Sequence, residues 1–190
     1  MDKHSARHSL IEILQNAYSG ELAAAYAYRG HWKSLTRQPE ISKVQQIENE
    51  EWIHRRNVGR MLAELGARPS RIKEARLWII GRSIGLICHL IGWFLPMYFA
   101  GRLESRNTEE YLNAAFYARE LGLMNFIDEL LVMSAVEKEH EVYFWTVIQG
   151  HRLLPITSRL FKWGRPGVLP VCAAVGARIE GQEQPDPSDL

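Results

Sequence analysis

Two short stretches of the sequence share the pattern Glu-x-x-His: Glu51 with His54, and Glu137 with His140. On a helix, residues three apart lie one turn apart on the same face, so each stretch presents a carboxylate beside an imidazole. A hard oxygen donor next to an imidazole nitrogen suits iron or manganese. One such pair often arises by chance, but two pairs in one chain predict a metal site.

Each Glu-x-x-His pair lies on an apolar stripe whose steps alternate between three and four residues, which is the period of a helix face. The stripes predict one helix over about 41–65 and another over about 123–149. Gly66 and Gly150 follow them as stop signals. The apolar members are Val44, Ile47, Val58, Met61 and Leu65 around the first pair, and Phe126, Leu130, Met133, Phe144 and Val147 around the second.

Two further glutamates interrupt the apolar stripes of other predicted helices. Glu21 lies among alanines in a predicted helix over 8–36, and Glu104 lies in one over about 102–121. Tyr111 follows Glu104 by two turns on the same face, where it either hydrogen-bonds a ligand, shuttles an electron or simply packs in the core. Four helices therefore place acidic or imidazole groups where the helical period expects apolar residues.

Buried carboxylates without partners would cost several kcal/mol each and would take up protons rather than stay charged. Two divalent metal ions would offset that cost. The sequence therefore predicts a site with two metal ions, either iron or manganese. The predicted ligands are Glu21, Glu51, His54, Glu104, Glu137 and His140.

The most apolar part of the chain is 77–101, which contains no charged residue from Ser83 to Gly101. Its length is nearly that of a membrane span. A span would separate Glu51 from Glu137 across the bilayer, so a shared metal site excludes it. Gly92 and Pro96 indicate a broken or bent helix. We expect this stretch to lie against a membrane surface or to wall a hydrophobic channel; an ordinary buried core helix is the alternative.

The 190 residues are 46% hydrophobic and 24% charged, with a net charge of +1, which is typical of one globular domain and gives no sign of a nucleic-acid partner. Cys88 and Cys172 form no disulfide pattern, and no signal peptide is apparent. The expected domains are a bundle over 8–150, an apolar and basic extension over 151–178, and a disordered acidic tail over 179–190. The extension is either interfacial or packed against the bundle.

These residues resemble the ferritin-like superfamily, and most closely the demethoxyubiquinone hydroxylase family of ubiquinone biosynthesis. The features that match are Glu21 in an alanine-rich helix, the two Glu-x-x-His pairs, Glu104 after a glycine-rich hydrophobic segment, and Tyr111 seven residues later. The resemblance implies an all-α, ferritin-like four-helix bundle. An additional hydrophobic helix would separate the second and third ligand-bearing helices.

By the same resemblance, the chain would be an O2-dependent di-iron monooxygenase that hydroxylates a hydrophobic, quinone-like substrate. It would work as a peripheral protein at the cytoplasmic, inner face of a membrane, with electrons from NADH or a reductase. Glu104 would be a catalytic, candidate bridging carboxylate and Tyr111 would assist. Glu48 and Glu50 would be solvated or would contact a ligand. A rubrerythrin-like peroxidase or ferroxidase, a non-catalytic metal-binding bundle, and a homo-oligomer stay open.

Overall fold

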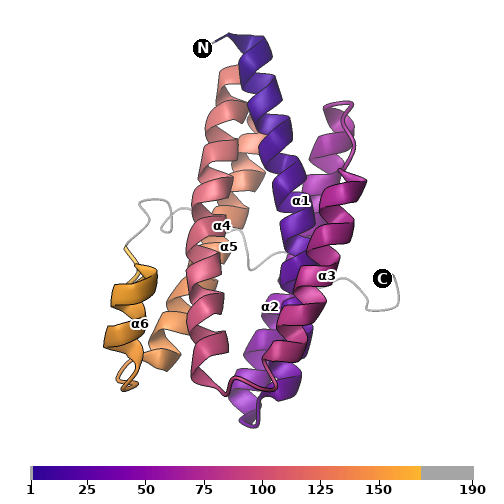
Figure 1. Ribbon diagram of the computed structural model, residues 1–190. Coiled ribbons are helices and arrows are strands. Elements are labelled where there is room, and N and C mark those ends of the chain that lie inside the picture. The colour runs from indigo at the N-terminus through magenta and orange to yellow at the C-terminus, as the bar shows by residue number, and fades with distance from the viewer. Residues whose placement is uncertain (1, 168–190) are drawn as a thin grey trace.

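The computed structural model describes residues 2–167, which contain six helices and no strand. Four long helices form an antiparallel bundle: α1 (Lys3–Ser34), α2 (Gln38–Glu64), α4 (Phe94–Leu121) and α5 (Met124–Ile148). Helix α3 (Arg71–Ile87) runs along the outside of the bundle next to α1, and the short α6 (Leu154–Phe161) lies on the other side beside α4 and α5 (Figure 1). The predicted all-α bundle with an additional helix is confirmed.

Prolines lie in the first turn of two helices that begin earlier than the sequence predicts. Helix α2 begins at Gln38 rather than 41, because Pro39 occupies its first turn, where the missing N–H is unpaired in any case. Helix α4 begins at Phe94 rather than 102, with Pro96 in its first turn. The apolar stretch 77–101 is therefore divided between α3 and α4, and Gly92 has a left-handed φ of 77° in the connection.

Helix α3 approaches α1 closely through glycines. A Cβ on Gly30 would collide with the backbone of Gly85, and one on Gly81 would collide with the backbone of Ala23. Only this narrow face of α3 is buried; Ile79 is 58% exposed and Leu86 is 71% exposed. The part of the apolar stretch that lies in α3 is therefore not an ordinary buried core helix within this chain.

Within residues 2–167, none of the helices combines the length and the apolar character that a membrane span requires. The part of the predicted extension that can be described, 151–167, contains α6. The rest of the extension and the predicted acidic tail over 179–190 lie outside the described residues.

The core consists of two apolar clusters that follow one another along the bundle axis. One cluster contains Leu14, Met61 and Leu130, and the other contains Ile47 and Phe144, with further residues in each. On every bundle helix the predicted ligands fall between the members of the two clusters. The polar site is thus enclosed at both ends by apolar side chains, which exclude water from it.

Candidate metal centre

The structure brings all six predicted ligands together in the middle of the bundle, and none of these residues is more than 4% exposed. Helices α1 and α4 each contribute one glutamate, while α2 and α5 each contribute one Glu-x-x-His pair. The one-turn spacing directs both members of each pair inward, as the periodicity predicts. This arrangement of four carboxylates and two imidazoles suits two metal ions. That these residues bind metal stays a prediction.

The six residues form two overlapping groups, in each of which the ligand atoms lie within 4.8 Å of one another. Glu51 and Glu137 belong to both groups. The Glu21 group adds Glu21 and His54, and the Glu104 group adds Glu104 and His140. Because only Glu51 and Glu137 are shared, the geometry favours them as the carboxylates that bridge two ions. The expectation that Glu104 bridges stays a prediction; Glu104 belongs to one group only.

Several ligand atoms are buried within residues 2–167 without a hydrogen-bond partner, which is unusual for polar atoms in a protein interior. A hydrogen bond to each would be expected if the site were purely structural. Metal ions would instead bind these free lone pairs, so the donor set fits two cations. The unpartnered atoms are Glu21 Oε2, both carboxylate oxygens of Glu51, Glu137 Oε1, His54 Nδ1 and His140 Nδ1.

Two buried tyrosines hold the two unshared carboxylates. Tyr111 on α4 donates a hydrogen bond to Glu21 on α1, and Tyr28 on α1 donates one to Glu104 on α4. Each tyrosine follows a ligand by seven residues on its own helix and contacts the ligand of the other helix. Of the roles left open for Tyr111, the structure shows the hydrogen bond to a predicted ligand, and Tyr28 makes the equivalent contact.

The two histidines are held differently. His140 Nε2 lies 2.6 Å from Glu50 Oε2, which leaves its Nδ1 facing the site at 3.8 Å from Glu51 and from Glu137. A carboxylate on the outer nitrogen fixes the orientation of a metal-binding imidazole. His54 Nδ1 is 2.7 Å from Glu137 Oε1, without the angles of a hydrogen bond. Both atoms are thus free to share a cation.

The electrostatics show that the site has an excess of negative charge. Burial raises the pKa of Glu51 well above its ordinary value, and the charges of Glu137 and Glu21 raise it further. Burial also raises the pKa of Glu104. Burial acts in the same direction on Glu137, but its close contacts with Glu104, His140 and His54 hold its pKa well below the usual value. Protons or cations must balance these charges, and metal binding would displace the protons.

A family model described as "Ubiquinone biosynthesis protein COQ7" matches residues 8–121, which is more than half of the chain. The chain belongs to this family. No curated protein and no solved structure matched. The match covers Glu21, Glu51, His54 and Glu104, whereas Glu137 and His140 lie beyond it and are placed at the site by the structure alone.

Membership of the COQ7 family confirms the predicted resemblance and the enzyme class, an oxidoreductase of ubiquinone biosynthesis. The buried carboxylate and imidazole cluster fits the di-iron type of site that this family has. The family therefore indicates an enzyme of ubiquinone biosynthesis, and the geometry is compatible with the metal site of that family.

Three residues at this COQ7-type site were missed or left open by the sequence interpretation. The role of Tyr28 could have been predicted from the sequence, because Tyr28 follows Glu21 by the same seven residues that separate Tyr111 from Glu104. Glu50 precedes a ligand, but nothing in the sequence indicates that it reaches α5. Asn107 donates hydrogen bonds of 3.2 Å to Glu104 and 3.4 Å to Glu137.

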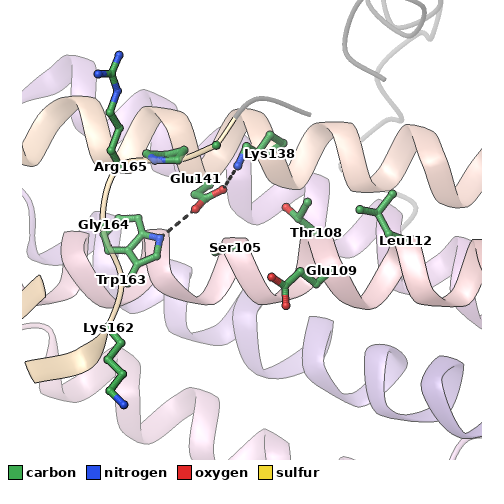
Figure 2. Close-up of a pocket in the computed structure, with 12 residues that line it drawn as sticks. Ser105, Thr108, Glu109, Leu112, Lys138, Glu141, Lys162, Trp163, Gly164 and Arg165 are labelled. Atoms are coloured by element: carbon green, nitrogen blue, oxygen red, sulfur yellow. Dashed lines mark hydrogen bonds and ion pairs between the residues drawn. The ribbon is translucent and has the colours of Figure 1, made fainter. Parts of the chain in front are cut away.

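A surface pocket of about 410 Å³ lies on the outer side of α4 and α5, away from the six ligands (Figure 2). Glu141 is buried at its wall and accepts hydrogen bonds from Lys138 at 2.6 Å and from the Trp163 indole at 3.0 Å. Glu48, the other glutamate beside the α2 ligands, is bound by Arg29 and Trp32. These carboxylates are paired within the protein and lie outside the COQ7-type site.

Proposed function

We propose that the chain uses two metal ions and O2 to hydroxylate a hydrophobic, quinone-like substrate at a membrane surface. The observation on which this rests is the sharing of Glu51 and Glu137 between the two ligand groups. Two separate single-metal sites would not need common carboxylates. When bound, a pair of reduced irons would supply two electrons to dioxygen, and an external reductant such as NADH or a reductase would restore them.

The residues of the chain would position and protect this chemistry. Tyr28 and Tyr111 hold the two unshared carboxylates by hydrogen bonds. These carboxylates would therefore keep their orientation although each belongs to only one ligand group. Glu50 keeps the inner nitrogen of His140 free. The two apolar clusters exclude water from both ends of the site, which limits side reactions of activated oxygen.

The exposed surface of α3 supports the membrane part of the proposal. Apolar side chains that a water-soluble surface rarely groups together are exposed along this helix and the connection after it. Arg76 and Arg82 lie among them with exposed side chains. Such a surface suits a peripheral protein that takes a hydrophobic substrate from a bilayer. The exposed members include Trp78, Ile79, Ile80, Ile84, Leu86, Ile87, Leu90 and Ile91.

The direct test is a single turnover with iron-loaded, full-length protein. The protein is reduced without oxygen, mixed with O2 and a demethoxyquinone, and the products are analysed. We expect a hydroxylated quinone from the wild type and none from Glu137→Ala, while the exposed-site control Glu139→Ala keeps the activity. Consumption of hydrogen peroxide without a hydroxylated quinone would instead identify a peroxidase, and stable folding without bound metal would identify a non-catalytic bundle.

A further inference from the structure

We propose that α6 is a second docking element, one that binds an anionic lipid surface through its outward face. The helix lies beyond the residues that the COQ7 family model matches. This inference rests on the proposed function only in assuming that the protein works at a membrane. Beyond that assumption, the inference names α6 as a second membrane contact and an anionic lipid as its partner. It also names the end of the bundle that would face the bilayer.

Helix α6 is held in one orientation by polar contacts with the bundle. The Tyr98 hydroxyl lies 3.1 Å from the backbone oxygens of Thr157 and Trp163, and Arg102 donates a 3.0 Å hydrogen bond to the backbone oxygen of Phe161. Trp163 points between α4 and α5 towards Glu141 (Figure 2). The buried face of α6 is therefore fixed, and so is the face that it turns to solvent.

The outward face of α6 is apolar. Ile156 and Leu160 are 67% and 68% exposed, and Leu153, just before the helix, is 40% exposed. Their spacing of three and four residues places them on one side, while Leu154 and Phe161 on another face pack against the bundle core. A surface helix of a water-soluble protein normally has the opposite arrangement, so this face indicates a non-aqueous partner.

The positive charge of residues 151–167 indicates which kind of partner binds α6. Residues 151–167 contain Arg152, Arg159, Lys162 and Arg165, all with exposed side chains, and no Asp or Glu. A symmetric contact between two copies would bring these cations against one another, which is unfavourable. An anionic lipid surface offers headgroups for the cations and an acyl boundary for the apolar side chains.

The position of α6 suits a planar surface. His151, just before α6, stacks on Phe94 at the start of α4 with the ring centres 4.1 Å apart. The α3–α4 connection and the α5–α6 turn therefore lie at the same end of the bundle (Figure 1). Leu90 in that connection is 83% exposed. A bilayer at this end would contact the end of α3 and the beginning of α6, including Leu153 and Ile156, whereas the rest of α3 and of α6 lies on opposite sides of the bundle (Figure 1).

The apolar part of the inference is tested by flotation of the full chain with phosphatidylcholine vesicles that contain phosphatidylglycerol. Ile156→Asp is expected to lower the vesicle partition coefficient roughly tenfold, because an apolar side chain would no longer enter the interface. Met124→Asp is the matched control: Met124 is 66% exposed and lies at the opposite end of the bundle, so binding is expected to be unchanged. Circular dichroism melts verify that each variant folds.

The charge part is tested with Arg159→Gln, which is expected to lower partition about fivefold on the anionic vesicles and not at all on pure phosphatidylcholine. Arg56→Gln on α2, whose side chain is also exposed, is the control.

Three outcomes would overturn the inference in different ways. If Ile156→Asp binds like the wild type while Leu90→Asp loses binding, α3 docks alone and the proposed function stands. If sedimentation shows a wild-type dimer that Ile156→Asp dissociates, α6 joins two copies. If the wild type binds neither kind of vesicle, the membrane part of the proposed function fails as well, and the turnover assay then tests the rest.

Discussion

The two halves of the candidate metal centre are alike in the ligands themselves and unlike in what supports them. Each half has one unshared glutamate, one histidine and the two shared carboxylates, and each unshared glutamate accepts a hydrogen bond from a tyrosine of the opposite helix. Only the Glu104 group has further support: Glu50 on His140, and Asn107 on Glu104. Among residues 2–167, no carboxylate outside the site contacts His54.

This difference indicates a division of roles. The symmetric ligands and tyrosines would define two similar metal positions, because the glutamate and the tyrosine recur with the same spacing on α1 and α4. The asymmetric contacts make the two positions chemically unequal. We expect the metal of the Glu104 group to be held more tightly, because its histidine is oriented by an outer carboxylate.

The largest effect is expected from removing a shared ligand. Glu51→Ala should abolish binding of both metals, whereas Glu21→Ala should remove only one, because Glu21 belongs to a single group. Metal per chain is measured by elemental analysis after loading with ferrous iron and desalting. Two irons retained by Glu51→Ala would contradict the assignment, and equal losses in both variants would contradict the sharing.

The next effect concerns His31, which stacks on Tyr28 and is buried without a partner for its Nε2 among the described residues. Burial lowers the pKa of His31 from 6.5 to about 4. The unfolded chain therefore binds more protons than the folded one between these values, so the free energy of unfolding falls as the pH drops through this window. The loss approaches about 3 kcal/mol at the acid end.

Urea unfolding of metal-free protein at several pH values measures this loss. His31→Phe should remove this part of the pH dependence, while His8→Phe, at an exposed position, should leave it. A His31→Phe variant with the full wild-type pH dependence would show that His31 is not the group responsible.

A smaller effect tests the asymmetry itself. Glu50→Gln should weaken one metal about 10- to 100-fold, as loss of a carboxylate behind a histidine ligand does, and leave the other unchanged. Two-site competition with a chelator measures both affinities, and Glu139→Gln at an exposed position on α5 is the control. Equal weakening of both metals would mean that Glu50 acts on the whole site rather than on His140.

The smallest effect tests the symmetry. Tyr28→Phe and Tyr111→Phe should each cost about 1.5 kcal/mol of stability, because each removes one buried hydrogen bond to a carboxylate. Denaturant midpoints of the two variants are expected to agree closely. A clear difference between them would show that the tyrosines, and not only Glu50 and Asn107, distinguish the two halves.

Much of the bundle and of the candidate site could be predicted from the sequence, because helical periodicity is a local property. The spacing of Glu51 and His54 on an apolar stripe is sufficient to turn both side chains inward, and the same holds for Glu137 and His140. The start of α4 was misjudged, because Pro96 is compatible both with a break and with a first helical turn.

The helical period is sufficient to predict which face of each bundle helix carries the ligands, and therefore which six residues can meet. The alignment of the helices along the bundle axis follows from tertiary packing. That alignment makes Glu51 and Glu137 the shared carboxylates, crosses the tyrosines between α1 and α4, and brings Glu50 to His140. The physical reason is that the offset between two helices depends on packing across their interface, which no period within one helix records.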